Sequence, residues 1–202
     1  MIRRGDFLWP DGDGWCWQVI HAELPDLALG MSYAKGRKCA VQAGGNVGVW
    51  AAHLAGVFNR VETAEPDPEN YDCLRRNVPR NVRHRRAAFG ERHKDVGFVP
   101  VPGNRGAGYL GGTGEIPVVT IDGLALSACD MIVLDVEGYE PLALRGAEYT
   151  IREFRPVLMF EEKGLSDAYY RLPRGTSEAW VRSLGLGYEV KARPRADVIM
   201  AC

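Results

Sequence analysis

The chain has 202 residues, of which 46% are hydrophobic and 25% charged, and its formal net charge is −1. This profile is typical of one globular domain with a sizeable core, and the near-neutral charge provides no global field for nucleic acid or an anionic membrane. The five cysteines are widely spaced without a C-x-x-C pair, and no apolar run has the length of a signal peptide or a membrane span, so we expect a cytoplasmic protein in a reducing compartment, with no membrane attachment, disulfide framework or structural zinc.

The first twenty residues are rich in tryptophan, glycine and aspartate, which predicts turns around a short hairpin or loop at the domain edge. Leu24–Ala34 follows as a possible short helix, and Pro25 suits its first turn. We assign residues 1–37 to an N-terminal edge or cap segment and residues 38–202 to the main domain of a single-domain protein.

Short apolar strands then alternate with helices. The expected strands are Cys39–Ala43, Val61–Glu65, a more polar Asn81–Ala88, Gly97–Val101, Ile116–Ile121, Met131–Val136 and Val157–Phe160. The expected helices are Val47–Val57, Pro68–Asn77, Glu140–Ile151 and Ser177–Leu184. Gly103–Gly114 is predicted as a glycine-rich loop, and Tyr188–Val190 with Val198–Ala201 as a closing hairpin. This alternation is typical of an α/β fold whose parallel sheet is covered on both faces.

The loop after the first of these strands has the composition of a ligand-binding turn. It reads Gln42-Ala43-Gly44-Gly45-Asn46-Val47-Gly48 and leads directly into a helix, whose amino end presents free N–H groups. Glycine lets the backbone turn sharply and approach a ligand closely. Glu65 ends the neighbouring strand, where a carboxylate can bind both hydroxyls of a ribose.

The glycine spacing separates the candidate ligands of this turn. The dinucleotide fingerprint G-x-G-x-x-G and the Gly-Lys-Ser/Thr end of a Walker loop are both absent. A looser turn suits S-adenosylmethionine, which has a ribose and an amino-acid tail but no phosphate. A glycine-rich turn without any ligand is the alternative interpretation, and Glu65 in register argues against it.

A series of motifs between residues 38 and 163 resembles the FkbM family of methyltransferases. The family's Asp-x-Gly-Ala-Asn-x-Gly motif corresponds to Gln42–Gly48, and its Glu-Pro-Asp-Pro motif with a following Leu-x-x-Asn corresponds to Glu65–Pro68 and Leu74–Asn77. The later matches are Ala87–Gly90, Thr120–Leu124, Asp135–Glu140, Leu144–Ala147 and Glu161. The resemblance implies a Rossmann-like methyltransferase fold with a mostly parallel seven-stranded sheet, helices on both faces and a C-terminal antiparallel hairpin. Residues 38–202 would then be the S-adenosylmethionine-binding domain.

The resemblance also implies a cofactor-binding set around the glycine turn and the ends of neighbouring strands. Its members are Gln42, Ala43, Gly44, Gly45, Asn46, Gly48, Glu65, Pro66, Ala88 and Asp135. Gln42 departs from the family, which has an acid at that position. Glutamine can still form hydrogen bonds, but it loses the charge attraction to the cofactor's ammonium. Weaker cofactor affinity, and a non-catalytic nucleotide-binding domain, are therefore alternatives that stay open.

Three carboxylates near the ends of later strands are the candidate catalytic groups: Asp135, Glu137 and Glu161. Methyl transfer from a sulfonium depends largely on positioning, and a hydroxyl acceptor also needs a base for its proton. We assign Asp135 to positioning of cofactor or acceptor and Glu137 to acceptor binding or proton removal, an order that can be reversed. Capping of the following helix is the alternative interpretation. Three carboxylates also suit a divalent cation, but no histidine falls at ligand spacing, and we predict no metal.

The candidate acceptor-binding residues are Asn104, Arg105, Tyr109 and Tyr139. Gly103–Gly114 is a candidate mobile lid over the acceptor, with a plain connector as the alternative. The resemblance implies O-methylation of a hydroxyl on a sugar, glycan or small polar molecule. A basic cluster within residues 75–94 raises RNA or DNA methylation as an alternative, but such clusters are more often solvated faces, and we expect no nucleic-acid partner. No feature of the sequence indicates an oligomeric state.

Overall fold

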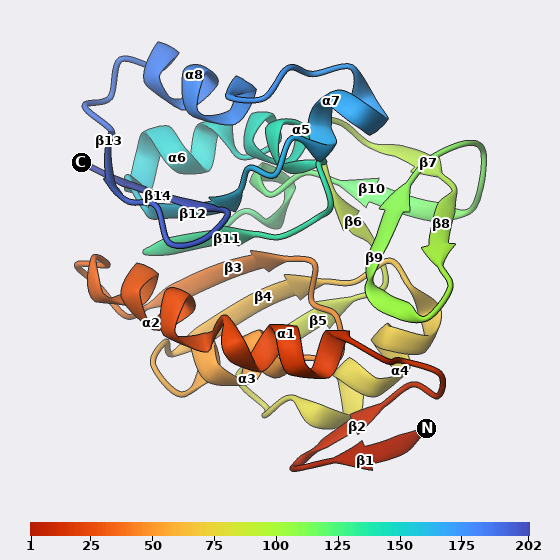
Figure 1. The fold of residues 1–202 in the computed structure, drawn as a ribbon. Helices are drawn as coiled ribbons and strands as arrows, with labels where there is room; N and C mark the ends of the chain where they lie inside the picture. The colour runs from red at the N-terminus through yellow and green to blue at the C-terminus, as the bar shows by residue number, and fades with distance from the viewer.

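The structure is a computed structural model that describes residues 1–202, and a seven-stranded sheet forms its centre (Figure 1). The strand order is β13-β14-β12-β11-β3-β4-β5. The five parallel strands are β3 (Cys39–Ala43), β4 (Arg60–Ala64), β5 (Val82–Arg85), β11 (Met131–Leu134) and β12 (Val157–Glu161). Next to β12, β14 (Asp197–Ala201) runs antiparallel to it, and β13 (Glu189–Ala192) at the edge of the sheet pairs antiparallel with β14. The predicted mostly parallel sheet and its C-terminal hairpin are confirmed.

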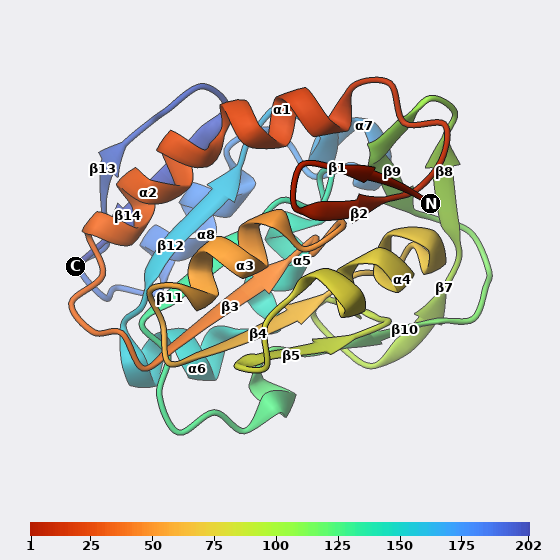
Figure 2. The same ribbon diagram turned by 90° about the horizontal axis from the view of Figure 1, so that it is seen from below.

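Helices cover both faces of this sheet, as the views in Figures 1 and 2 show. One layer contains α5 (Glu140–Arg145), α6 (Glu148–Phe154) and α8 (Thr176–Ser183). The other contains α1 (Cys16–Ala22), α2 (Leu24–Ser32), α3 (Val49–Ala55) and α4 (Pro68–Asn77). The short α7 (Leu165–Tyr170) lies beyond the carboxyl end of β12. None of the helices combines the length and the apolar character needed to cross a bilayer.

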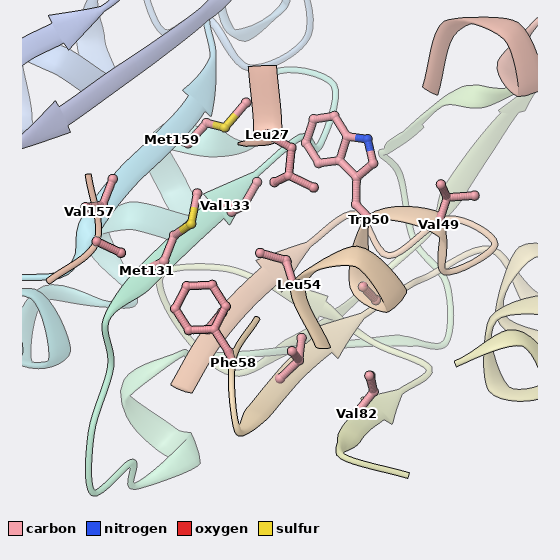
Figure 3. Packing of buried hydrophobic residues seen from close by; sticks show 14 of the residues in the cluster. Leu27, Val49, Trp50, Leu54, Phe58, Val82, Met131, Val133, Val157 and Met159 are labelled. Atoms are coloured by element: carbon pink, nitrogen blue, oxygen red, sulfur yellow. The ribbon is translucent and has the colours of Figure 1, made fainter. Parts of the chain in front are cut away.

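Each face of the sheet carries its own hydrophobic core. Strand β11 shows the principle, because Met131 and Val133 pack into one cluster and Ile132 and Leu134 into the other. A strand buried on both faces tends to be apolar at successive positions, which explains the continuous run of β11 in the sequence. Figure 3 shows the cluster beneath α2 and α3, where Leu27, Trp50, Leu54 and Phe58 meet side chains of β11 and β12. Full burial of one such side chain contributes about 1.5–3 kcal/mol.

The short hairpin predicted as one alternative for the first twenty residues is present, and a helix that was not predicted follows it. Strands β1 (Ile2–Arg4) and β2 (Phe7–Trp9) form an antiparallel hairpin, and α1 follows at Cys16. The buried Asp13 organises the connection, because it accepts hydrogen bonds from Trp9 Nε1 at 2.8 Å and from the Cys16 N–H at 3.2 Å. A single buried carboxylate thus holds the hairpin against the start of α1.

The predicted glycine-rich loop at Gly103–Gly114 is wrong over most of its length. Strand β9 (Asn104–Leu110) pairs antiparallel with β8 (Phe98–Val101), and the two form a hairpin. Because β9 has glycines at alternate positions, it lacks the alternation of apolar and polar residues that predicts a strand. At Gly108 an added Cβ would lie 2.2 Å from the Phe98 ring, so the paired strand requires glycine there.

Two other predicted elements are divided. The third strand, predicted over Asn81–Ala88, ends at Arg85, and the separate β6 (Ala88–Phe89) belongs to a small sheet of order β6-β10-β7, with β10 (Ile116–Val119) and β7 (Lys94–Val96). The helix predicted over Glu140–Ile151 is interrupted between α5 and α6 at Gly146. A Cβ at Gly146 would lie 1.9 Å from the Gly90 carbonyl oxygen, so a tertiary contact breaks the helix there. A short 3-10 turn, η1 (Asp122–Leu124), completes the fold.

Candidate active site

An open cleft of about 1060 Å³, its mouth included, lies at the carboxyl ends of β3, β4 and β11. Its walls come from α1, from the turn after β3, from the start of α4, from the β8–β9 hairpin and from the loop after β11 (Figure 1). Open α/β sheets bind ligands at this end of their strands. The glycine turn and the loop that holds Asp135 and Glu137 therefore open into the same space.

The turn after β3 closes so tightly that glycine is required at its centre. The N–H groups of Gly44 and Gly45 both donate to the Ala64 carbonyl, at 3.2 and 2.9 Å, and Gly44 has a φ of +79°. A Cβ at Gly44 would lie 1.8 Å from the Asp135 carbonyl oxygen. Asn46 also has a positive φ, +47°, and its own Oδ1 accepts the Val47 N–H at 2.7 Å. The turn thus exposes main-chain atoms, without a Cβ at Gly44, to the cleft.

Glu65 lies beside this turn with both carboxylate oxygens engaged by backbone. Oε2 accepts the Asn46 N–H at 2.7 Å and Oε1 accepts the Asp67 N–H at 2.8 Å. Burial raises the pKa of Glu65 to about 8, although the two N–H donors oppose the shift. Each oxygen retains a second lone pair for a ligand hydroxyl.

Asp67 and Asn70 extend the Glu65 side of the cleft. Asp67 caps α4, as the sequence predicts, by accepting the N–H groups of Glu69 and Asn70 at 2.8 and 3.0 Å. Asn70 lines the cleft, donates to the Arg105 carbonyl at 2.8 Å, and buries its Oδ1 without a hydrogen-bond partner. Buried polar atoms are normally hydrogen-bonded, so this oxygen is available to accept a hydrogen bond from a ligand.

Gln42 braces the turn from within β3. Its Nε2 donates to the Gly44 carbonyl at 3.1 Å, and its Oε1 accepts from Thr63 Oγ1 at 3.1 Å. Only 2% of the residue is exposed, yet it forms part of the cleft wall. The amide therefore braces the turn with one donor and one acceptor, whereas an ionised acid could only accept.

At the other end of the cleft, three carboxylates converge. Oxygen atoms of Asp135, Glu137 and Glu161 lie within 4.8 Å of one another, a spacing that a divalent cation can also use. Lys163, which the sequence analysis missed, pairs its ammonium with Glu161 and lines the cleft. A positive charge is therefore already present at this carboxylate cluster.

The crowding of these carboxylates changes their acidity. Burial, followed by the charge of Asp135, raises the pKa of Glu137 to about 7 and that of Glu161 to about 9. Burial also raises the pKa of Asp135, and Lys163 opposes that shift. Burial lowers the pKa of Lys163, but the surrounding carboxylates, Glu161 first, outweigh it and raise the pKa overall. The cluster therefore takes up protons readily near neutral pH.

The backbone separates Glu137 from any helix-capping role. Glu137 has a φ of +52°, in the left-handed region that non-glycine residues rarely adopt. No side chain caps α5, and in the loop before it the Glu140 Oε1 accepts the N–H groups of Val136 and Gly138 at 3.0 and 3.3 Å. No backbone N–H donates to the side chain of Asp135 or Glu137. Both carboxylates are thus available to the cleft.

Among the residues predicted to bind the acceptor, Tyr139 lines the cleft and has a buried hydroxyl without a hydrogen-bond partner. Asn104 and Arg105 also line the cleft, and the Arg105 guanidinium pairs with Glu69 at 2.6 Å. Tyr109 lies elsewhere, because its ring stacks on Tyr169 of α7 at 4.0 Å between centroids. The hairpin is therefore joined both to the start of α4 and to α7.

Most of the predicted site residues share this cleft. The residues in its wall are Gln42, Gly44, Asn46, Glu65, Pro66, Ala88, Asn104, Arg105, Asp135, Glu137 and Tyr139. Ala43, Gly45 and Gly48 lie outside the wall but belong to the turn, and Glu161 lies behind Lys163. Tyr109 is outside the site. Residues of the wall that sequence reasoning missed include Trp50, Asn70, Phe89, Phe98, Lys163, and Cys16, Val19 and Ile20 on one face of α1 with Glu23 just after it. The spacing of the α1 residues is helical and was a usable signal.

Comparisons with known proteins agree with this geometry. Residues 42–178 match the family model described as the methyltransferase FkbM domain. No curated protein matches the chain.

Several solved structures share the fold. A methyltransferase FkbM from Methylobacillus flagellatus KT is 24% identical, with a TM-score of 0.57 over 81% of this chain and 42% of that one. Precorrin-6y C5,15-methyltransferase from Geobacter metallireducens GS-15 is 12% identical, with a TM-score of 0.54 over 99% of this chain and 95% of that one. A DhpI–SAM–HEP complex is 13% identical, with a TM-score of 0.51 over 91% and 86%. This chain spans less than half the length of the Methylobacillus protein.

Proposed function

Because the chain belongs to the FkbM family of methyltransferases, we propose that it transfers a methyl group from S-adenosylmethionine to a hydroxyl of a sugar, glycan or other small polar acceptor. One observation carries the proposal: a single cleft contains both the Glu65 side, which suits a ribose, and the Asp135–Glu137 side, which suits proton removal. The acceptor class follows from the family resemblance and from the polar groups at the second side.

The residues around the glycine turn fit an adenosyl cofactor. Glu65 and the unpartnered Oδ1 of Asn70 provide acceptors for two ribose hydroxyls. Pro66, Ala88 and Phe89 provide an apolar wall for the adenine. Gln42 and the turn backbone would face the amino-acid tail. When bound, S-adenosylmethionine supplies a methyl group activated by its sulfonium.

The residues of the carboxylate cluster would act on the acceptor. Glu137 accepts the proton of the acceptor hydroxyl, and a pKa of about 7 suits a base that works near neutral pH. The Tyr139 hydroxyl donates a hydrogen bond that orients the acceptor. Lys163 offsets the negative charges of Asp135 and Glu161. It also opposes the rise in the pKa of Glu137, so that Glu137 can be deprotonated near neutral pH. Asp135 positions the reacting groups from the end of β11.

The same acidic lining disfavours a nucleic-acid acceptor, because a phosphate backbone would meet Glu23, Asp135 and Glu137. We further propose that residues 1–37 act as a cap over the domain formed by residues 38–202. Helix α1 supports this division, since it lines one side of the cleft.

Thermal unfolding with and without ligand tests the cofactor assignment. S-adenosylhomocysteine at about 100 times its Kd stabilises the folded protein by about 2.7 kcal/mol and raises Tm by several degrees. NAD is the matched control, because it shares the adenosine but carries a pyrophosphate for which the turn has no fingerprint. Equal Tm values with and without millimolar S-adenosylmethionine or S-adenosylhomocysteine would overturn the proposal.

A further inference from the structure

A second hollow lies on one face of β4 and β5, at the edge of the sheet visible in Figure 2. Its volume is about 680 Å³, its mouth included, and it shares no residue with the cleft. Its polar lining is provided by Arg60, Glu62, Arg83, Arg85, His93 and Thr120. We refer to these six residues as the β4–β5 groove.

The alternation of side chains along the strands creates this groove. Arg60 and Glu62 are two residues apart on β4 and share a face, as do Arg83 and Arg85 on β5. The parallel register places Glu62 beside Arg83. Since β5 is the last strand of the sheet, no further strand pairs with its outer edge, and the groove lies next to that edge.

Glu62 explains part of the positive charge in the groove. Its side chain is fully buried, and a buried carboxylate requires ionic or hydrogen-bonding partners. Oε1 accepts from Arg60 Nε at 2.7 Å, and Oε2 accepts from Arg85 Nη2 at 2.7 Å. Both carboxylate oxygens are therefore already engaged, and one negative charge faces two guanidinium groups.

Arg83 and one nitrogen of Arg85 are left over, although the Arg85 guanidinium also lies over the Phe89 ring at 5.7 Å from its centroid. Arg83 forms no ion pair, and the buried Nη1 of Arg85 has no hydrogen-bond acceptor. A buried donor left without an acceptor costs about 1–3 kcal/mol. Neighbouring basic residues behave differently, because Arg75 and Arg76 both pair with Asp72 on the surface of α4. Arg83 is exposed and free to meet an anion from solvent, whereas solvation does not account for the buried Nη1 of Arg85.

We propose that the β4–β5 groove binds a phosphate or sulfate group. A guanidinium presents planar N–H pairs that match the oxygens of such an anion, and Arg83 and Arg85 approach it from one strand face. The Thr120 hydroxyl and His93 lie in the same lining and provide further polar contacts. The anion can be free in solution or be the phosphoryl end of a small metabolite, since both present the same oxygens.

Binding of inorganic phosphate to the full chain at constant ionic strength tests this site. The readouts are the phosphorus NMR linewidth and Tm, with sodium chloride as the control salt. Arg83→Gln removes the unpaired guanidinium, and Arg85→Lys keeps a cation against Glu62 but removes the unpartnered Nη1. Each change weakens phosphate binding by about tenfold. Arg80→Gln is the matched control, because Arg80 is an exposed basic residue of the same region that does not line the groove.

Loss of binding in the two groove variants, with wild-type binding in Arg80→Gln, supports the site. No phosphate binding by the wild type, or equal weakening in all three variants, overturns it. A comparison of inorganic phosphate with glucose 1-phosphate separates the two sources: tighter binding of the ester identifies a metabolite, and equal binding identifies a site for the free anion. Arg85→Lys can destabilise the protein, so its Tm is also measured without phosphate. If Arg85→Lys does not fold, the comparison of Arg83→Gln with Arg80→Gln decides the test.

Discussion

Replacement of Glu65 by glutamine is the sharpest perturbation of the cofactor half of the cleft. The carboxylate accepts the N–H groups of Asn46 and Asp67 at 2.7 and 2.8 Å, one on each oxygen. The amide of glutamine keeps one of these acceptors and turns an N–H₂ group toward the other donor. One charge-assisted hydrogen bond is lost and the ribose site is distorted. A hydrogen bond to a charged group contributes about 1.5–3 kcal/mol, so Kd should rise by about 10–150-fold.

Isothermal titration with S-adenosylhomocysteine at about pH 9 measures this change, because Glu65, with a pKa of about 8, is ionised there. Glu69→Gln is the control, because 59% of the Glu69 side chain is exposed and its change should leave Kd within about twofold. Burial raises the pKa of Glu65 to about 8, and hydroxyl donors bind better to the ionised form. The affinity of the wild type should therefore increase as pH rises through about 8, and that of the variant should not. A Kd for Glu65→Gln within about threefold of wild type would refute the ribose assignment.

Three further predictions concern stability and the acceptor. Gly44→Ala should lower the free energy of unfolding in urea by about 2–5 kcal/mol, since it forces a Cβ at positive φ against the Asp135 carbonyl; a loss below about 1 kcal/mol would contradict that contact. Tm of the free protein should fall as pH rises from about 5 to about 9, because buried carboxyls with raised pKa stabilise the fold while protonated and lose this as they ionise; a Tm that rises over this range would be the contrary result. The carboxyls concerned are Glu65, Glu137, Glu140, Glu161 and Asp197. Tyr139→Phe should leave the free energy of unfolding nearly unchanged, since the hydroxyl has no partner, but should raise KM for the acceptor about fivefold; an unchanged KM would remove Tyr139 from the acceptor site.

The fold was largely predictable because its central strands are buried on both faces. Such strands are mostly apolar: β11 is apolar throughout, and β3 and β12 carry polar residues only at Gln42 and Glu161, near their carboxyl ends. The start of α4 was equally visible, because Asp67 and Pro68 are local signals whose effect depends on the next three residues. Local sequence signals were therefore enough to predict the strands and the helix on the Glu65 side of the cleft.

The parts that were missed depend on contacts between distant segments. Strand β9 carries glycines, and its pairing with β8 and its anchors at the start of α4 and on α7 do not follow from its composition. Gly146, at the end of α5, must be glycine because the carbonyl of Gly90, 56 positions earlier in the chain, approaches it closely. Lys163 enters the site beside Glu161, at the end of its own strand, and Asp135 and Glu137 from the loop after β11 add to the attraction of its charge. No local pattern contains these relations.

The central claim is that Glu137 removes the acceptor proton in a cleft that binds S-adenosylmethionine. The most direct test is transfer of a labelled methyl group from S-adenosylmethionine to a panel of sugars and small polyols, by the wild type and by Glu137→Gln. The matched control is Glu162→Gln, since Glu162 is a neighbouring acid outside the cleft wall. We predict that the wild type methylates at least one hydroxyl acceptor with a rate that rises through pH about 7, and that Glu137→Gln still binds S-adenosylhomocysteine but transfers about 10²–10⁴ times more slowly. Equal rates in Glu137→Gln and the wild type, or methylation confined to RNA, would contradict the account.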